Sequence, residues 1–415
     1  MNYLPRVVDR ELDELLPLAG AIALEGPKGV GKTGTAERRA TTALLLDDLV
    51  HRELIAADPT MAGLRGTVLI DEWQRMPQVW DTVRRQVDAG VPPGRYLLTG
   101  SATPRSGVDT HSGAGRILSV RMRPMGLPER GVTQPTVSLG SLLDGDAGEL
   151  AGSTQWTAAD YLDAIERSGL PALTGAPPRL RQAQLDAYLE RVVDRDLPDQ
   201  GLRVRRPETL RRWLSAYAAA SSTTTAYSRI LDATTAGDGS QPAKTTTIAY
   251  RDHLTQLYLL DPVPGWSPSR SPMSRLQQAP KHQLADPALS ARLLNLSAQT
   301  LGTPRGAHLA GPLFESLATL TVRPAAQARQ ARVGHLRTRN GDHAVDLVVE
   351  GDDGRVLGIE VKLAAAVGDH DVRHLLWLRE QLPHEVVDLI VLTSGAHAYR
   401  RPDGVAVVPL ALLGL

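Results

Sequence analysis

Residues 21–33 read Ala-Ile-Ala-Leu-Glu-Gly-Pro-Lys-Gly-Val-Gly-Lys-Thr, and this stretch sets the fold of the first third of the chain. Its apolar start predicts a strand, and residues 33–46 are expected to form a helix. A glycine-rich loop between a strand and a helix can wrap its backbone N–H groups around a triphosphate. The sequence therefore predicts an ATP site with the loop residues Gly26, Pro27, Lys28, Gly29, Val30, Gly31, Lys32 and Thr33.

Four side chains in and after this loop have distinct expected roles. Lys32 is expected to reach the β- and γ-phosphates, and the Thr33 hydroxyl is expected to bind Mg²⁺. The next apolar strand, residues 67–70, ends in Asp71-Glu72. We expect Asp71 to hold Mg²⁺ through water and Glu72 to polarise the water that attacks the γ-phosphate.

Polar residues next to two later strands are further candidates. Residues 96–98 lead into Thr99-Gly100-Ser101, at the strand edge where ligands collect in parallel sheets. Thr99 or Ser101 is therefore expected to sense the attacking water, with a polar strand cap as the alternative. Arg116 precedes the strand-like residues 117–120 and is expected to stabilise transition-state charge in its own or a neighbouring subunit. A phosphate-positioning or purely structural role is the alternative for Arg116.

Composition limits the class of protein. A chain of 415 residues is long enough for two to three domains. The 46 basic and 46 acidic residues cancel, so a nucleic-acid surface would have to be a local patch. Cysteine is absent, which excludes disulfides and thiolate metal sites. No signal peptide is recognised, and no apolar run reaches the roughly 20 residues of a membrane helix, so we expect a cytoplasmic protein without membrane contact.

The chain is expected to divide into three regions. Residues 1–130 form the nucleotide-binding region, and residues 125–154, rich in Gly, Pro, Ser and Asp, mark its boundary. Residues 155–300 carry amphipathic helices, predicted at 180–197, 207–220 and 245–260. These helices could form a helix-turn-helix or winged-helix unit that binds DNA, or simply pack against the first region. Residues 301–415, in which strands are predicted again after the helices, form the third region.

A second chemical site is predicted on a hairpin of the third region. Residues 344–350 and 355–362 read as two strands joined by a Gly/Asp turn. Alternation places Asp346, Glu360 and Lys362 on one face, with Asp346 opposite Glu360. The other face is expected to bury an apolar set, namely Val345, Leu347, Val349, Leu357, Ile359 and Val361.

This hairpin face has the groups that phosphodiester cleavage needs. Asp346 and Glu360 are expected to bind Mg²⁺ or Mn²⁺, and Glu315 on a preceding helix could add a ligand. Lys362 would orient or deprotonate the attacking water. A solvated hairpin face with a chance salt bridge is the alternative. Upstream arginines could hold a phosphate backbone or simply be solvated, and these are Arg329, Arg332, Arg337 and Arg339.

Lysine usage supports both sites. Basic residues are almost all arginine, and the lysines are Lys28, Lys32, Lys244, Lys281 and Lys362. Lysine is expected to persist where a compact ammonium is needed and a planar guanidinium does not fit. Lys32 and Lys362 are two such places.

At these residues the chain resembles bacterial and archaeal ATPases that have an AAA domain of the AAA_14 type and a C-terminal DUF4143 region. The first half of the resemblance is carried by residues 26–33, 68–74, 97–101 and 115–116, and the middle by 188–196 and 280–287. Val345-Asp346 and Glu360-Val361-Lys362 look like the PD-(D/E)XK nuclease signature. Ala344 departs from the family, which often has a glutamate there, and so does Pro287-Ala288, where Gly-Leu is usual.

The resemblance implies an α/β protein with three parts. These are a P-loop (RecA/AAA-like) parallel sheet domain, a helical and winged-helix middle, and a restriction-endonuclease-like α/β domain. We expect an ATP- and Mg²⁺-dependent enzyme that acts on nucleic acid, most simply DNA, and that can form a homo-oligomer. The alternative is an ATP-switched module that binds DNA or protein without cutting. A metabolic kinase is disfavoured, because Asp71-Glu72 favours water as the acceptor.

Overall fold

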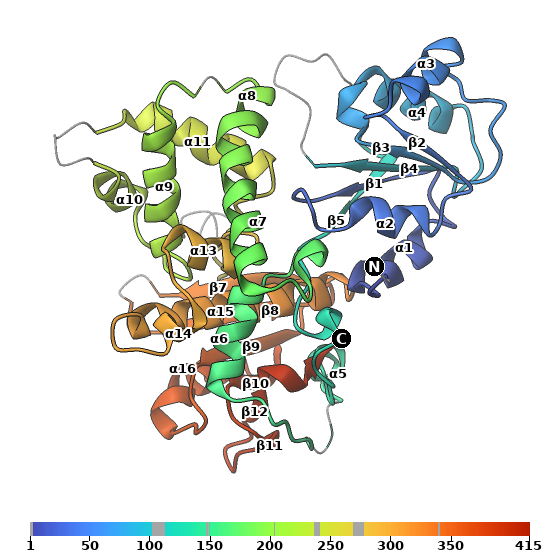
Figure 1. The fold of residues 1–415 in the computed structure, drawn as a ribbon. Coiled ribbons are helices and arrows are strands. Elements are labelled where there is room, and N and C mark those ends of the chain that lie inside the picture. Colours follow the sequence, from blue (N-terminus) through green and yellow to red (C-terminus); the bar gives the residue numbers. More distant parts are fainter. Residues whose placement is uncertain are drawn as a thin grey trace.

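The computed structural model describes residues 3–101, 113–146, 148, 150–202, 204–235, 241–268, 278–338 and 341–415. Figure 1 shows a sheet domain at the N-terminal end, a helical region beside it, and a second sheet domain that contains the C-terminus. Among the described residues, every helix is too short or too polar to cross a bilayer.

The N-terminal domain is built on a five-stranded parallel sheet with strand order β2-β3-β4-β1-β5. Its strands are β1 (Ala21–Glu25), β2 (Thr42–Leu45), β3 (Val68–Asp71), β4 (Tyr96–Gly100) and β5 (Ile117–Arg121). Its helices are α1 (Val7–Leu15), α2 (Lys32–Glu37), α3 (Leu49–Ala57), η1 (Trp73–Arg75) and α4 (Gln78–Asp88). The central strands are continuously apolar because helices cover both faces of such a sheet.

The helix predicted for residues 33–46 is wrong beyond Glu37. Helix α2 ends at Glu37, and Thr42–Leu45 forms the edge strand β2. This strand pairs with β3, from Thr42 opposite Val68 to Leu45 opposite Asp71. The ladder to a distant strand therefore overrides the local helical pattern.

The helical region follows after a short connection of η2 (Pro128–Arg130), β6 (Val137–Ser138) and α5 (Leu139–Asp144). Its larger helices are α6 (Ala158–Arg167), α7 (Pro178–Arg191), α9 (Pro207–Ala219), α10 (Tyr227–Ala233), α11 (Lys244–Gln256) and α13 (Pro287–Leu293). Short turns complete it, namely η3 (Pro171–Leu173), the π-helix η4 (Val192–Asp196), α8 (Leu197–Asp199) and α14 (Ala298–Leu301). The helices predicted at 180–197, 207–220 and 245–260 are confirmed, with small shifts of their ends.

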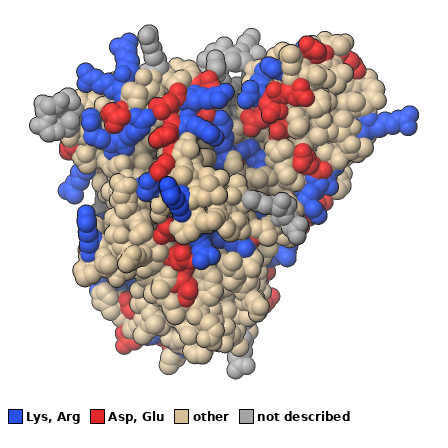
Figure 2. All heavy atoms as spheres, viewed as in Figure 1, with Lys and Arg blue, Asp and Glu red and all other residues tan. Residues whose placement is uncertain are grey.

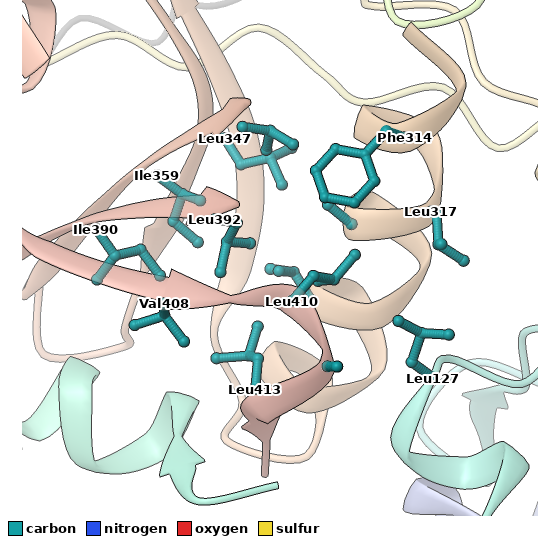
Figure 3. Close-up of a cluster of buried hydrophobic side chains, with 14 of the residues drawn as sticks. Leu127, Phe314, Leu317, Leu347, Ile359, Ile390, Leu392, Val408, Leu410 and Leu413 are labelled. Atoms are coloured by element: carbon teal, nitrogen blue, oxygen red, sulfur yellow. The ribbon is translucent and has the colours of Figure 1, made fainter. Parts of the chain in front are cut away.

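The C-terminal domain holds a six-stranded mixed sheet with order β11-β12-β10-β9-β8-β7. Its strands are β7 (Arg332–Arg337), β8 (Ala344–Glu350), β9 (Val356–Lys362), β10 (Val386–Thr393), β11 (Tyr399–Arg400) and β12 (Ala406–Pro409). Helix α15 (Ala307–Gln327) packs on one face and α16 (Asp369–Gln381) on the other. In Figure 3, Phe314 of α15 faces Leu347 of the sheet, and Ile359, Ile390 and Leu392 belong to the same buried cluster.

Residues before the helical region also belong to this core. Leu127, Leu139 and Leu142 are buried in the same cluster as α15 and the strands. Strand β6 pairs in parallel with β13 (Leu413–Gly414) close to the C-terminus, after the turn η5 (Leu410–Leu412). Residues that follow β5 therefore contribute to the core of the C-terminal domain.

The predicted hairpin register is confirmed. Leu347 lies opposite Ile359 and Val348 opposite Gly358, which is the register predicted from Asp346 and Glu360, and the paired ladder ends at Leu347. The expectation that Val345 shares the face of Leu347 is wrong, because Val345 packs on the α16 side with Val348. The pairing of β7 with β8 shifts by one residue between Gly334 and Leu336, and this irregularity breaks the alternation at Val345.

Candidate functional site

The glycine-rich loop follows β1 at the carboxyl edge of the N-terminal sheet and leads into α2. Gly29 and Gly31 have φ angles of 79° and 96°, in the left-handed region that favours glycine. A Cβ at Gly26 would lie 2.1 Å from the backbone oxygen of Met122, so only glycine fits there. The loop geometry thus depends on three of its glycines, as expected for a backbone that wraps around a phosphate.

Lys32 is buried under this loop, with an exposed fraction of 6%. Its ammonium donates hydrogen bonds to the backbone oxygens of Gly26 and Pro27, each at 2.9 Å. Burial lowers the pKa of Lys32 to about 8, although the Glu72 and Asp71 charges oppose the shift. The ammonium therefore rests on carbonyl oxygens that phosphate oxygens can replace.

Thr33 and Asp71, the predicted Mg²⁺ pair, lie together. The Thr33 hydroxyl donates to Asp71 Oδ1 at 2.8 Å, and the Thr99 hydroxyl donates to the same oxygen. Asp71 ends β3 and Thr99 lies on β4, so adjacent strands bring these oxygens to one edge. A hydroxyl and a carboxylate at this edge match the oxygen ligands that Mg²⁺ prefers.

Glu72 lies beside this pair and is held by two neighbours. Its φ of 54° is left-handed, which turns the chain sharply after β3. The Ser101 hydroxyl donates to both carboxylate oxygens, at 3.1 and 3.2 Å, and the Gln74 amide also donates to Glu72. Thr99 and Ser101 thus contact different acids, and Gln74 is a contact that sequence reasoning missed.

Arg116 does not lie near the loop. It precedes Ile117, which pairs with Ala21 at the start of β1, whereas the loop follows Glu25 at the opposite end. Its guanidinium instead pairs with Asp88 at 2.8 Å. The expectation that Arg116 acts on a nucleotide in its own subunit is therefore wrong in this arrangement, because a parallel strand puts its two ends on opposite edges of the sheet.

Arg121 lies at the correct edge and was missed from the sequence. It ends β5 opposite Glu25, immediately before the loop, and its charge helps to lower the pKa of Lys32. Burial lowers the pKa of Arg121 itself. Its nearest carboxylate, Asp261, is shared with Arg123 and Arg323 at shorter distances. Sequence signals for Arg121 were weak, because arginine is common throughout the chain.

Arg6 holds the glycine-rich loop through hydrogen bonds to backbone oxygens. It donates to the backbone oxygens of Val30 and Arg123, both at 2.7 Å, and pairs with Glu129 at 3.0 Å. Arg6 precedes α1, so the N-terminal segment supports the loop that follows β1. No local pattern marks this residue, and only the tertiary contacts identify it.

The helical region covers the loop at two points. Leu170 and Pro171 approach the positions of Gly29 and Gly31, and Lys28 forms an ion pair with Asp196 of the π-helix η4. Asp286 holds the first of these contacts, because its carboxylate accepts hydrogen bonds from the Ser168 hydroxyl and the Gly169 amide, at 2.6 and 2.7 Å. Lys28 therefore faces the helical region, which sequence reasoning did not anticipate.

The acidic residues of the C-terminal site gather around an unexpected lysine. Lys281 Nζ lies 2.7 Å from Glu315 Oε1 and 2.9 Å from Asp346 Oδ1. Burial opposes ionisation of Asp346, but the Lys281 charge outweighs it and holds the Asp346 pKa below its ordinary value. Burial and the Asp346 charge raise the pKa of Glu315 to about 8. The sequence marked Lys281 as one of few lysines and as part of residues 280–287, but it assigned no role to its ammonium.

Glu360 and Lys362 lie next to this group. Lys362 Nζ pairs with Glu360 Oε1 at 2.8 Å, and Glu360 Oε2 is buried without a hydrogen-bond partner. Burial and the Asp346 charge raise the pKa of Glu360 to about 7. In the described part of the chain, no three acidic or histidine side chains are close enough together to hold one metal ion. The predicted residues converge, but Lys281 occupies the space between Asp346 and Glu315.

The upstream arginines have separate surroundings. Arg329 pairs with Asp144, and Arg337 donates to the Thr224 hydroxyl at 2.9 Å. Arg332 starts β7 with an exposed side chain, and Arg339 lies outside the described residues. Arg329 and Arg337 therefore each have a polar partner of their own.

Comparison with known families agrees with this architecture. Residues 19–130 match the AAA_14 family, described as an AAA domain. Residues 158–300 and 310–413 match two domains of unknown function, DUF8612 and DUF4143. The AAA domain supports an ATPase-type function for the N-terminal part.

Two mycobacterial relatives cover almost the whole chain. The uncharacterized protein Rv2008c of Mycobacterium tuberculosis is 27% identical over 411 residues, which is 96% of this chain and 82% of the relative. The uncharacterized protein Mb2031c of Mycobacterium bovis has the same values. The similarity therefore extends over all three regions.

Solved structures give weaker similarities. The Walker-type ATPase PABY2304 of Pyrococcus abyssi is 15% identical, with a TM-score of 0.38 over 69% of this chain and 94% of that chain. A mutant of RuvB from Thermotoga maritima is 20% identical, with a TM-score of 0.28 over 63% and 94%. From the family matches, the chain carries an AAA domain of the AAA_14 family at its N-terminal end and a DUF4143 domain at its C-terminal end.

Proposed function

We propose that this protein binds ATP with Mg²⁺ at the loop 26–33 and hydrolyses it. The observation that carries the proposal is the group of contacts at one sheet edge. Thr33 and Thr99 donate to Asp71, and Ser101 donates to Glu72. These residues come from α2, β3, β4 and the turns that follow the two strands, so only a parallel sheet with this order brings them together.

The proposed chemistry assigns one task to each side chain. Lys32 leaves the backbone oxygens of Gly26 and Pro27 and binds the β- and γ-phosphates. Thr33 and Asp71 would hold Mg²⁺, which when bound neutralises charge on those phosphates. Glu72, fixed by Ser101, accepts a proton from the attacking water as the water oxygen bonds to the γ-phosphorus and the bond to the bridging oxygen of ADP breaks.

ATP binding and ATP turnover can be tested separately. Lys32→Ala is expected to weaken binding of a fluorescent ATP analogue by the full-length protein. Glu72→Gln is expected to retain binding but to lower turnover by roughly 10²-fold or more, as for other general bases. Glu53→Gln, on the exposed surface of α3, is the matched control. The proposal is wrong if Lys32→Ala binds the analogue as well as the wild type does.

A second candidate function is metal-dependent cleavage of a phosphodiester in nucleic acid, most simply DNA, at Asp346, Glu360 and Lys362. The observation that favours it is the buried Glu360 Oε2, an acceptor without a partner beside a lysine ammonium. Figure 2 shows basic and acidic side chains interspersed on the face in view, so contact with nucleic acid would have to be local.

The alternative to cleavage is binding of DNA or protein without cutting. Purified protein with Mg²⁺ or Mn²⁺ should cut plasmid or linear DNA if cleavage is correct. Asp346→Ala and Lys362→Ala should each abolish cutting while ATP turnover persists. If the wild type is as inert as both variants on every nucleic acid tried, the non-cleaving role is favoured. The homo-oligomer expected from the sequence is a further proposal, and sedimentation with and without ATP tests it.

A further inference from the structure

Lys281 is anchored by its backbone and buried by its side chain. Its N–H donates to the backbone oxygen of Val263, and its own oxygen accepts from the N–H of Val263, both at 2.9 Å. The exposed fraction of Lys281 is 9%. The ammonium is directed to the acidic pocket, which we define as Glu315, Asp346 and Glu360.

The three donors of this ammonium match three acceptors in the pocket. Lys281 Nζ donates to Glu315 Oε1 at 2.7 Å, to Asp346 Oδ1 at 2.9 Å and to the backbone oxygen of Asp346 at 3.3 Å. The remaining Asp346 oxygen, Oδ2, accepts from the Val361 amide at 3.0 Å. Both carboxylate oxygens of Asp346 therefore have partners, and one of them is held by Lys281.

Glu360 is the third residue of the acidic pocket, and only one of its two carboxylate oxygens has a partner. Its Oε1 pairs with Lys362, whereas its Oε2 is buried without a partner. A buried carboxylate oxygen without a partner is costly, because it has lost its water and gained nothing in exchange. This oxygen is therefore available to a donor or a cation.

We propose that Lys281 is the resident cation of the acidic pocket, and that its ammonium and a divalent metal ion exclude one another there. The proposal rests on the metal-binding role proposed above for Asp346 and Glu360. A divalent ion needs several oxygen ligands, and Lys281 holds two of them. A positive charge at 2.7–2.9 Å from these oxygens also repels a second cation.

Withdrawal of Lys281 would complete a ligand set. It frees the two carboxylate oxygens that Lys281 holds, Asp346 Oδ1 and Glu315 Oε1, together with the backbone oxygen of Asp346. These oxygens lie on β8 and α15, which pack in one domain. With Lys281 in place these oxygens are already paired and the hairpin binds metal only weakly, which corresponds to a resting state of the proposed cleavage site. A lysine whose charge lies far from these oxygens would leave metal affinity unchanged when removed.

Binding of Mn²⁺ alone to the full-length protein, without nucleotide, tests the proposal by calorimetry or by the electron spin resonance of free Mn²⁺. Lys281→Met is expected to bind Mn²⁺ roughly tenfold or more tightly than the wild type, because a repelling charge is gone. Asp346→Asn added to Lys281→Met is expected to remove this binding. Lys244→Met, an exposed lysine on α11, is the matched control and should match the wild type.

Folding is checked by circular dichroism and thermal unfolding, since Lys281→Met leaves buried carboxylates without a counter-ion. If that variant does not fold, Lys281→Met with Glu315→Gln, which removes one negative charge as well, is measured in its place with the same expectation. Increased thermal stability on addition of Mn²⁺, in the variant but not in the wild type, would be a second supporting result.

The outcomes separate the inference from the function on which it rests. If the wild type already binds Mn²⁺ in a way that Asp346→Asn abolishes, and Lys281→Met binds no more tightly, the metal site stands and the role of Lys281 is overturned. If neither protein binds Mn²⁺ in an Asp346-dependent way, the metal role of the hairpin fails, and the inference fails with it.

Discussion

Lys28 and Asp196 form an ion pair across 2.5 Å that ties the nucleotide-binding loop to the helical region. The two side chains are in different surroundings. The Asp196 side chain is 6% exposed, whereas the Lys28 side chain is 48% exposed. Asp196 lies in the π-helix η4, and such irregular turns occur frequently at functional sites. The pair therefore joins the loop that is proposed to bind ATP to the region that covers it.

Removing either partner should destabilise the protein, but by unequal amounts. Lys28→Ala leaves a buried carboxylate without its cation, whereas Asp196→Ala leaves a lysine in water. We therefore expect Lys28→Ala to lower the free energy of unfolding more than Asp196→Ala does. Chemical denaturation without nucleotide measures both, with the exposed Arg195→Ala as control. Equal losses, or effects of the two changes that simply add in the double variant, would contradict a direct pair.

Nucleotide binding should take up protons above pH 8. Burial lowers the pKa of Lys32 to about 8, so at pH 8.5 much of the free protein carries a neutral amine. A bound triphosphate raises this pKa, because a neighbouring negative charge favours the ammonium. ATP affinity is therefore expected to fall as the pH rises from 8 through the higher pKa of the bound state.

Calorimetry in two buffers of different ionisation enthalpy measures this proton uptake directly. The wild type should take up a fraction of a proton per ATP at pH 8.5. Lys32→Arg keeps a charged side chain at this pH and should take up none. If the wild type and the variant give the same proton count, the depressed pKa of Lys32 is wrong.

Arg121 and Arg116 provide a matched pair at the two ends of β5. Arg121→Gln removes a cation next to the loop and is expected to weaken ATP binding by roughly tenfold, the usual effect of losing one charge-assisted contact. Asp261 retains Arg123 and Arg323, so the fold should tolerate the change. Arg116→Gln, at the far edge, should bind ATP as the wild type does.

Titration with a fluorescent ATP analogue compares the two arginine variants. Equal affinity of Arg121→Gln and the wild type would remove Arg121 from the site. Turnover by Arg116→Gln that is impaired only at high protein concentration would instead assign Arg116 to the site of a neighbouring subunit.

Asp286 should be among the costliest residues to remove. It is fully buried, accepts from Ser168 and Gly169, and also caps α13 through the Ala288 amide at 2.9 Å. Asp286→Ala is expected to lower the free energy of unfolding by about 3 kcal/mol, because it leaves several buried donors without acceptors.

An ordinary helix cap is the comparison for Asp286. Ser297 caps α14 through the Thr300 amide, so Ser297→Ala should cost only about 1 kcal/mol. Urea denaturation of the two variants checks the difference. Similar losses for both would show that Asp286 acts as a cap alone and does not hold the segment over the loop.

Short-range patterns in the sequence predicted much of the two sites. The loop 26–33, the acids Asp71 and Glu72, and the register that sets Asp346 opposite Glu360 all follow from residues close together along the chain. Local sequence is sufficient there because a loop between a strand and a helix, and alternation along a hairpin, are determined by neighbouring residues.

The sequence by itself therefore determined which groups the loop and the hairpin present, and only the tertiary structure decided what lies against them. Residues 42–45 form a strand because β3 pairs with them. Arg121, and not Arg116, lies beside the loop because the two residues are at opposite ends of β5, and β5 is parallel to β1. Lys281 meets Glu315 and Asp346 only when segments 34 and 65 residues away pack against it. Contacts at such separations depend on how the elements pack together, and a pattern confined to neighbouring residues cannot specify them.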